Sequence, residues 1–415
     1  MIEYGLIGSN VENSFSKLIH ESFKKIHYEL VSLKTEKEVL EFLDSDFKGL
    51  NVTIPYKNLA FTYCDVVSDT AKVTECVNTI VRKDGKLFGY NTDIFGFEKL
   101  IERNNITIEN KDCLILGTGS TSRTVTFVLE KLGAKSIKYL SRDPKIPNSF
   151  GYNDYNHYKS SQIIINTTPI GMNDEESLLD FSILSNAEYF IDVIYNKAHT
   201  KMAIKALNNG IKTINGFYML LAQAQRSQEL FFEREIEEEI VKKTYTKLFF
   251  KFYNLALIGH PLSGKTSVAN ALSIRLKIPY IDIDNEIEKQ EGSKIVKIFA
   301  EKGVPYFRNL EYSLIEKYSK LKGTIISLGG GSVLYENNMN NILNSSLVIS
   351  LSRDPSIIQE KEFVNRPLCT CKKQLVDLIS KRKRLYEIYS DLHIENDGSI
   401  EKVIEKIGEI LWSFS

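Results

Sequence analysis

The clearest chemical signal in the chain is a glycine-rich loop at residues 259–266, which reads GHPLSGKT. The spacing G-x-x-x-x-G-K-T, between a β-rich run and a helix-favouring run, is typical of a loop that binds nucleotide phosphates. Its glycines let backbone N–H groups point at phosphate oxygens. Lys265 provides a cation, and the Thr266 hydroxyl can ligate Mg²⁺. The predicted ATP-binding residues of this loop are Gly259, Leu262, Ser263, Gly264, Lys265, Thr266 and Ser267.

Two carboxylates follow this loop in the run PYIDIDNEIE at 279–288. Asp282 and Asp284 lie two residues apart at the end of an expected strand, and period-2 geometry puts both on one face. One of them can then hold the Mg²⁺ shell, while the other orients or deprotonates a hydroxyl group that accepts phosphate. The alternative is an acidic strand-to-helix turn in which Asp284 only caps the helix.

A second glycine-rich turn, GTGSTSR at 117–123, lies between an expected strand and an expected helix. Its two glycines match the first two positions of a dinucleotide fingerprint, and a serine stands at the third. Where an NAD-binding protein has an acidic residue, at the end of the next strand, the chain has Ser141 and Arg142. A cation there suits a 2′-phosphate and favours NADP, with Arg123 as a second phosphate ligand. The acidic Asp143 follows directly and weakens this inference. Without its context, the motif also fits a plain structural turn.

A lysine and an aspartate in the first hundred residues form a candidate proton-transfer pair. Lys57 ends the run NVTIPYK, and Asp93 lies in the loop GYNTDIFGF at 89–97. A positioned lysine can donate a proton to a reacting oxygen when a carboxylate holds it in place. The alternative is a surface lysine and a helix-capping aspartate, because exposed charges are mostly solvated.

The composition of the 415 residues fits soluble globular domains, with 43% hydrophobic and 26% charged residues, and the length predicts two or three of them. The 53 basic and 53 acidic residues balance, so the basic footprint of a nucleic-acid-binding protein is missing. The five cysteines include no C-x-x-C pair, and neither a zinc site nor a disulfide framework is expected. We expect no signal peptide or membrane span, and therefore a cytoplasmic protein.

Short apolar runs alternate with amphipathic helical stretches along the chain, which predicts an α/β architecture. A charged, helix-favouring run at 233–248 gives way to the strand-like FFKFYNLALIG. The main boundary is therefore expected near 245–253, with a short or helical connection, because no Gly/Pro/Ser-rich tether is present.

The stretch from about 254 to 415 resembles shikimate kinase, on the two motifs above together with YFRNLE (306–311), SLGGGSV (327–333), NRPL (365–368) and KRKRLY (381–386). The resemblance implies a Mg²⁺ role for Asp282 and substrate binding and proton abstraction for Asp284, with Lys265 also catalytic. It implies two arginines on the substrate carboxylate, a contact from the glycine turn, and a lid arginine over the phosphates. The carboxylate-binding arginines are Arg308 and Arg382, although Arg384 could take the place of Arg382. The glycine turn is Gly329, Gly330 and Gly331, and the lid arginine is Arg366.

Residues 1–232 resemble shikimate dehydrogenase, on the motifs IGSNVENSFSKLIH (7–20), NVTIPYK, NTD (91–93), GTGSTSR, NTTPIGM (166–172), DVIYN (192–196) and NGFYMLLAQAQ (215–225). The resemblance makes Lys57 and Asp93 the catalytic pair. The implied substrate-binding residues are Ser14, Ser16, Thr53, Asn78, Asp93, Tyr195 and Gln223. The implied NADP-binding residues are Gly117, Gly119, Ser120, Thr121, Ser122, Arg123, Ser141, Arg142, Asn166, Thr167, Thr168, Gly216 and Met219. The chain departs from the family at Lys197, where a proline is common, and at Phe217 and Tyr218, where smaller residues are usual.

Together the two resemblances imply a three-part chain that runs consecutive steps of one pathway. The expected parts are a substrate-binding domain (1–97 plus 217–245), a Rossmann NADP-binding domain (98–216) and a P-loop kinase domain with a parallel sheet (250–415). NADPH would reduce 3-dehydroshikimate to shikimate, and ATP with Mg²⁺ would phosphorylate the product. The expected partners are these small molecules, with neither nucleic acid nor membrane.

Three alternatives remain from the sequence. The first half can be a quinate/shikimate oxidoreductase that uses NAD, or a catalytically silent module. The second half can be a P-loop kinase for another small molecule, but that would not explain two carboxylate-binding arginines next to the adjacent dehydrogenase-like half.

Overall fold

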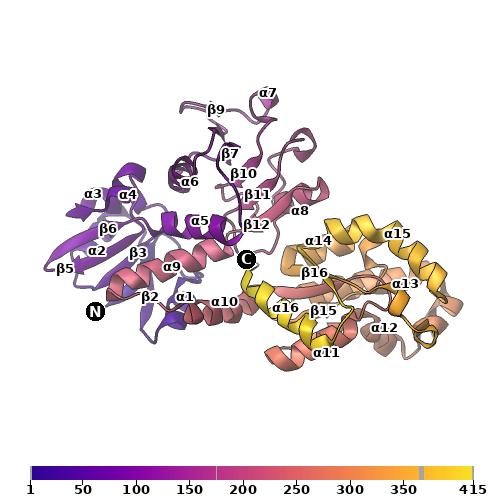
Figure 1. The fold of residues 1–415 in the computed structure, drawn as a ribbon. Helices are drawn as coiled ribbons and strands as arrows, with labels where there is room; N and C mark the ends of the chain where they lie inside the picture. Colours follow the sequence, from indigo (N-terminus) through magenta and orange to yellow (C-terminus); the bar gives the residue numbers. More distant parts are fainter. Residues whose placement is uncertain (1, 174, 364–368, 414–415) are drawn as a thin grey trace.

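The computed structural model describes residues 2–173, 175–363 and 369–413, and it contains three separate sheets with helices packed on them. Figure 1 shows the first two sheets close together and the third to one side. The predicted α/β architecture is confirmed.

The first sheet is mixed, with the strand order β2-β1-β3-β5-β6-β4. Its elements are β1 (Tyr4–Gly8), α1 (Ser16–Phe23), β2 (Tyr28–Ser32), α2 (Glu36–Leu43), β3 (Gly49–Val52), α3 (Lys57–Tyr63), β4 (Val66–Val67), α4 (Asp69–Thr74), β5 (Thr79–Lys83), β6 (Lys86–Tyr90) and α5 (Thr92–Arg103). β1 and β3 run parallel, with Ile7 opposite Val52. The loops after these two strands therefore leave from the same edge of the sheet, where Thr53 and the turn before α1 begin.

The second sheet has the order β12-β11-β10-β7-β8-β9, and all of its pairs are parallel. Its elements are β7 (Asp112–Leu116), α6 (Ser120–Lys131), β8 (Ser136–Leu140), β9 (Ser149–Phe150), α7 (Tyr155–Tyr158), β10 (Ile163–Asn166), β11 (Tyr189–Asp192), α8 (Lys201–Asn208) and β12 (Lys212–Asn215). The strand order reverses at β7, between β8 and β10. Ligands of such sheets bind in the crevice beyond the carboxyl ends of the strands at this switch point.

The third sheet is also parallel, with the order β14-β15-β13-β16-β17. Its elements are β13 (Asn254–Ile258), α11 (Lys265–Leu276), β14 (Tyr280–Asp282), α12 (Ile283–Glu291), α13 (Ile295–Ser319), β15 (Ile325–Ser327), α14 (Glu336–Ser345), β16 (Ser346–Ser352), α15 (Lys372–Ile388), β17 (Leu392–Glu395) and α16 (Ile400–Ser413). β13 is the central strand, so the glycine-rich loop at 259–264 leaves from the middle of the sheet. α13 is kinked at Gly303, whose φ is +78°, two residues before Pro305.

Two helices connect the parts. α9 (Phe217–Phe232) returns from the second sheet to pack against α5, and α10 (Glu238–Phe252) leads directly into β13. In Figure 1, α10 lies between the first sheet and the third. The predicted helical connection is present as α10. The predicted domain boundary at residue 97 falls inside α5, and those at residues 245 and 250 fall inside α10. The domain boundaries given above therefore fall within or beside helices and stay a prediction.

A single hydrophobic core extends from the first half of the chain into the third sheet. It joins Ile19 and Phe217 of the first half to Leu255 and Leu257 of β13. Between them lie the buried hydrophobic side chains of α10, which are Val241, Tyr245, Leu248, Phe249 and Phe252. Because these residues belong to one packed cluster, the two halves bury part of their apolar surface against each other.

This shared core predicts that one substitution weakens both halves. Phe249 is buried, and its ring lies 5.3 Å from that of Tyr253. Phe249→Ala should lower the unfolding free energy by about 3–5 kcal/mol, because it removes a buried aromatic ring and leaves a cavity. Hydrogen exchange should become faster in both β7 and β13.

Phe190→Ala is the matched control, because Phe190 is equally buried but belongs to a core of the second sheet only. It should accelerate exchange in β7 and leave β13 unchanged. If Phe249→Ala acted on one half alone, the two halves would not share a core.

Candidate active sites

Lys57 and Asp93 form an ion pair in a cleft of the first half. Lys57 is the first residue of α3, Asp93 lies in the first turn of α5, and their Nζ and Oδ2 atoms are 2.5 Å apart. Both side chains are 13% exposed. Burial lowers the pKa of Lys57, but the Asp93 carboxylate, with smaller contributions from Cys76 and Tyr195, outweighs burial and leaves this pKa raised. The lysine is therefore a protonated donor held in place by its carboxylate.

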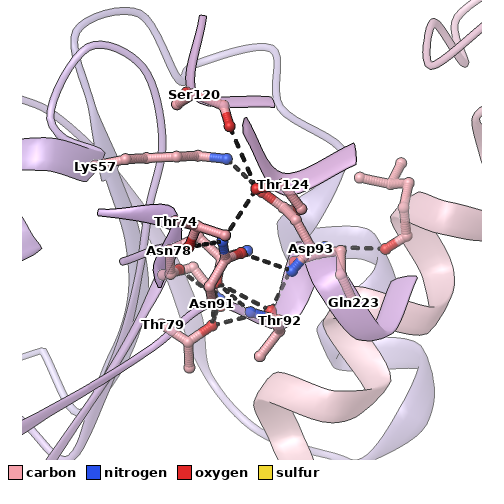
Figure 2. Close-up of polar contacts among 12 residues, drawn as sticks. Lys57, Thr74, Asn78, Thr79, Asn91, Thr92, Asp93, Ser120, Thr124 and Gln223 are labelled. Carbon is pink, nitrogen blue, oxygen red and sulfur yellow. Dashed lines mark hydrogen bonds and ion pairs between the residues drawn. The ribbon is translucent and has the colours of Figure 1, made fainter. Parts of the chain in front are cut away.

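A buried polar network fixes the first turn of α5, as Figure 2 shows. The Asn91 side chain caps the helix by accepting from the Asp93 N–H at 3.2 Å, and it donates to the Thr74 and Thr124 hydroxyls at 3.0 Å. Asn78 accepts from the Thr92 N–H at 2.8 Å. Asn91 was not among the predicted site residues, although its position before Thr92 and Asp93 is typical of a helix N-cap.

The other predicted substrate residues lie on several further elements of the first half. Ser14 and Ser16 occupy the turn that starts α1, and their hydroxyls are 3.1 Å apart. The Phe15 ring between them contacts Tyr195 edge-on at 6.3 Å. Burial raises the pKa of Tyr195, and the charge of Lys57 opposes this rise. Three others also lie at this site: Thr53 begins the loop after β3, Asn78 belongs to the network above, and Gln223 of α9 reaches Thr92 at 3.5 Å.

A cleft of about 510 Å³ connects Lys57 to the glycine turn after β7. Gly117 has a φ of +97°, which favours glycine, and a Cβ on Gly119 would meet no atom within 4 Å. A side chain at position 119 would therefore occupy the open cleft, which is where a ligand's phosphates would approach the backbone. The predicted residues that line the cleft are Gly117, Gly119, Ser120, Thr121, Arg123, Ser141, Arg142, Thr167 and Thr168.

Asp143, the residue that weakens the inference of a 2′-phosphate site, is bound elsewhere. Its carboxylate pairs with Lys145 at 2.5 Å. Among the described residues, no ion pair to Arg142 is found, and Arg142 is exposed at the cleft. The arrangement fits a dinucleotide with an additional phosphate.

Several predicted cofactor residues have structural contacts instead of a free side chain. Arg123 donates to the Thr74 carbonyl and to the Asn58 side chain, both at 3.0 Å, so it ties α6 to the first sheet. Asn166 is buried and bonds to Thr168 and Asp192. The remaining three predicted residues pack inside the fold and do not line the cleft; they are Ser122, Gly216 and Met219.

The loop at 259–264 has the conformation of a phosphate cradle. Gly259, Leu262 and Gly264 have φ values of +145°, +68° and +87°. A Cβ on Gly259 would lie 2.1 Å from the Leu351 carbonyl oxygen, so only glycine fits there. The Lys265 ammonium donates to the Gly259 carbonyl at 3.0 Å, across the mouth of the loop. Of the remaining three predicted loop residues, Ser263 lies in the loop, and Thr266 and Ser267 lie in the first turn of α11.

The loop and the two aspartates meet in a second cleft, of about 520 Å³. The Thr266 hydroxyl donates to Asp282 at 2.6 Å, and the Ser327 hydroxyl donates to the same carboxylate oxygen at 3.0 Å. Asp284 lines the cleft beside Gly329. The described residues hold no cluster of three metal-binding His, Cys, Asp or Glu side chains. A hydroxyl beside a single carboxylate fits Mg²⁺, which keeps several waters and binds substrate phosphates.

Arg308 is held at the far end of this cleft. Its guanidinium donates to Glu311 at 2.5 Å, and the fully buried Glu311 also accepts from the Ser332 hydroxyl at 2.6 Å. A Cβ on Gly331 would lie 2.3 Å from Arg308 Nη2, so the glycine turn makes room for the arginine. Arg308 Nε is buried and has no hydrogen-bond partner among the described residues. This orphaned donor fits an anionic ligand.

The two arginines of α15 face different parts of the molecule. Arg382 lines the cleft and donates to the Gly330 carbonyl at 2.7 Å, as does the Tyr386 hydroxyl. Arg384 lines a different cavity, between the second and third sheets. The geometry therefore favours Arg382 as the partner of Arg308. Arg366, the predicted lid residue, lies outside the described residues.

Three residues of the second site were missed from the sequence. His260 is in the glycine-rich loop, and its Nε2 accepts from the Arg353 N–H at 3.0 Å. Burial lowers the pKa of His260 to about 4, so the ring is neutral. Arg353 lines the cleft in an ion pair with Glu362 at 2.8 Å. Asn396 donates to the Ser263 carbonyl at 2.9 Å. No motif spacing connects these positions to the loop.

The two clefts define an α/β protein in which a dinucleotide-dependent reductase precedes a P-loop kinase. Comparisons with known proteins agree. Residues 6–80 match the family model of the shikimate dehydrogenase substrate binding domain, and residues 261–412 match that of shikimate kinase.

The relatives of the first half are similar over nearly their full length. The chain is 34% identical to the shikimate dehydrogenase (NADP(+)) of Clostridium perfringens (strain 13 / Type A) over 268 residues, covering 60% of this chain and 99% of the relative. A crystal structure of a chorismate mutase/shikimate 5-dehydrogenase fusion protein from Clostridium acetobutylicum is 31% identical, with a TM-score of 0.57, covering 60% of this chain and 98% of that one. Shikimate dehydrogenase 1 from Peptoclostridium difficile is also 31% identical, with a TM-score of 0.55 and coverages of 61% and 99%.

The chain therefore belongs to the shikimate dehydrogenase family, and a shikimate kinase domain follows in the same chain. It is a bifunctional enzyme of the shikimate pathway, and its two parts imply NADP and ATP as nucleotides. In the part of the chain that the structure describes, no helix is long and apolar enough to cross a membrane.

The contact between Gly331 and Arg308 generates a prediction for the kinase site. Gly331 has a φ of −103°, which any residue can adopt, so Gly331→Ala tests only the space that Arg308 needs. We expect the KM for shikimate to rise about tenfold or more, because a displaced arginine loses its bidentate contact with a carboxylate. Steady-state kinase assays measure this.

Gly408→Ala is the control, because a Cβ at residue 408 would meet no atom within 4 Å. It should leave the kinase unchanged. An unchanged KM in Gly331→Ala would show that Arg308 does not bind the acid.

Proposed function

We propose that the first half reduces 3-dehydroshikimate to shikimate with NADPH, and that the second half transfers the γ-phosphoryl group of ATP to the shikimate 3-hydroxyl. One observation carries the proposal: each half combines a nucleotide cradle and a set of substrate-binding groups in one site. In the first half, the cleft runs from the glycine turn to Lys57. In the second, a single cleft contains Lys265, Asp284, Arg308 and Arg382.

In the reductase site, Lys57 donates a proton to the carbonyl oxygen of the substrate as it becomes an alkoxide. NADPH supplies the hydride. Asp93 fixes the ammonium at 2.5 Å and accepts a ring hydroxyl. The Thr92 N–H fixes the Asn78 amide by occupying its oxygen, so that Nδ2 is the end that donates to a second hydroxyl. Ser14 and Ser16 bind the carboxylate at the opposite end of the ring.

The reductase site favours NADPH over NADH by charge. The N-terminus of α6 at Gly119 to Thr121, where backbone N–H groups lack intrahelical partners, would hold the dinucleotide phosphates. Ser141 and Arg142, which follow β8, would hold the 2′-phosphate. Arg123, which lines the same cleft and holds α6 against α4, is proposed as the second phosphate ligand.

In the kinase site, Asp284 accepts the proton of the 3-hydroxyl while Arg308 and Arg382 hold the carboxylate. ATP would supply the phosphoryl group, and Thr266 and Asp282 would hold the Mg²⁺ that neutralises its charge. Lys265 and the loop N–H groups stabilise the charge that develops on the phosphoryl oxygens. Arg366 is proposed to close over the phosphates. Catalysis is therefore positioning and charge neutralisation.

The proposal is tested by two reciprocal substitutions. Lys57→Ala should reduce the dehydrogenase kcat by about 10²–10⁴, because it removes the proton donor, and it should leave the kinase intact. Lys265→Ala should do the reverse, with a loss of about 10²–10³, because it removes a cation aimed at the phosphates. Each variant is the control for the other in two separate assays, with 3-dehydroshikimate and NADPH for the dehydrogenase and with shikimate and Mg·ATP for the kinase. Loss of both activities from either variant would contradict two independent sites.

A second experiment tests the preference for NADP. Arg142→Ala should raise the KM for NADPH about tenfold and leave the KM for NADH unchanged, because only NADPH has the 2′-phosphate. Lys145→Ala, which removes a nearby cation already paired with Asp143, should change neither constant. A wild-type enzyme that used NADH as well as NADPH would overturn the role of Arg142.

A further inference from the structure

The residues that end the junction helix reach the substrate pocket of the dehydrogenase. The Phe252 ring lies 4.2 Å from that of Phe15, in the turn between the two carboxylate-binding serines. It also contacts the Tyr195 ring edge-on at 6.5 Å. The next residue, Tyr253, donates a hydrogen bond from its buried hydroxyl to the Tyr195 carbonyl. The turn at Phe15 and the loop at Tyr195 therefore both rest on residues that lie just before β13.

The loop that begins at Tyr195 then binds the kinase domain directly. The Ala198 N–H donates to the Asn344 carbonyl at 3.1 Å, in the last turn of α14. His199 contacts the Leu343 carbonyl through Nδ1 at 2.9 Å and the Asp391 carboxylate through Nε2 at 2.8 Å. These three contacts and the Tyr253 hydrogen bond cross from the dehydrogenase to the kinase half within five consecutive residues, 195–199.

The pair of His199 and Asp391 is a buried, charge-assisted contact. The side chains are 6% and 7% exposed. A carbonyl and a carboxylate can only accept, so both ring nitrogens donate and the ring carries a positive charge. Burial lowers the pKa of His199, but the Asp391 carboxylate outweighs burial and leaves this pKa raised. Asp391 is itself fixed, because it accepts from the Val348 N–H at 2.7 Å.

We propose that Tyr253 and Asp391 are positioning residues for the dehydrogenase reaction. They hold the loop at 195–200 so that the Tyr195 phenol closes the substrate pocket next to Lys57. The kinase half thus completes the pocket of its neighbour. The inference rests on the proposed function of the first half.

A positioning role for Tyr253 and Asp391 predicts different kinetic constants from a role that only stabilises the interface. A loosened loop frees the Tyr195 ring, whereas none of residues 195–200 is among those that line the NADP cleft. The substrate KM should therefore respond and the NADPH KM should not. An interface that only stabilised the fold would change neither constant in the folded enzyme.

The experiment uses Tyr253→Phe in the full chain, which deletes one hydroxyl and keeps the ring. We expect the KM for 3-dehydroshikimate to rise about fivefold, with the NADPH KM and the kinase activity unchanged. In a Tyr195→Phe background the same substitution should raise this KM by less than about twofold, because its effect passes through the Tyr195 hydroxyl. Equal increases in both backgrounds, or no increase in the wild type, would overturn the proposal.

Tyr245→Phe is the matched control, because it removes a buried hydroxyl from the same helix, at a ring that packs against Phe217. It should leave the dehydrogenase constants unchanged. Asp391→Asn should reproduce the change in substrate KM from the other end of the loop. Glu188→Gln, which breaks the ion pair with Lys111 away from this loop, should not.

Hydrogen exchange of the Ala198 amide provides a readout that needs no activity. Asp391→Asn should accelerate exchange at Ala198 about tenfold or more, because the loop then opens more often, and Glu188→Gln should not. A wild-type chain that failed to reduce 3-dehydroshikimate would contradict the proposed function alone. Unchanged exchange at Ala198 would contradict the positioning role alone.

Discussion

Burial of the aromatic side chains of α10 determines how the two halves of this chain meet. Phe217, at the start of α9, packs against Tyr245, Phe252 and Tyr253 at ring distances of 5.0–5.6 Å. The family resemblance leads us to expect a smaller residue at this position, and these ring contacts explain the larger one. Phe217 fills the space between α9 and the junction. Because apolar area removed from water stabilises roughly in proportion to its size, these rings favour one arrangement of the halves.

Both active sites depend on a second constraint, which is that a cation in a cleft needs an acceptor when no substrate is bound. Lys57 has Asp93, Arg308 has Glu311, and Lys265 has the Gly259 carbonyl. Each partner orients its cation while leaving donors that a substrate can use, such as Arg308 Nε. A desolvated charge without such a partner would destabilise the fold by several kcal/mol. The partners therefore preorganise the sites as well as stabilise them.

The sequence predicted the parts of the sites that have a fixed local spacing, and it missed those that depend on packing between distant segments. Both glycine turns, the Lys57–Asp93 pair and the arginines at the kinase cleft could be found from motifs, because their backbone or charge requirements leave a short pattern. Other features depend on tertiary neighbours. Arg123 binds a backbone carbonyl of α4, and Arg384 lines a different cavity from Arg382. His199 and Asp391 are 192 residues apart, and no periodicity marks them as a pair.

The junction at Tyr253 fixes the orientation of the two halves, which a flexible linker would not do. A Gly/Ser-rich linker would leave their orientation free, but here Tyr253 contacts the dehydrogenase loop and the next residue begins the central strand of the kinase sheet. Five residues of β13 then span about 17 Å to the phosphate loop. The strand is rigid and hydrogen-bonded on both sides. Because the loop at 195–200 is bonded both to Tyr253 and to α14, a shift between the halves would have to break buried contacts at each point. The dehydrogenase pocket is therefore built against a fixed surface of the kinase.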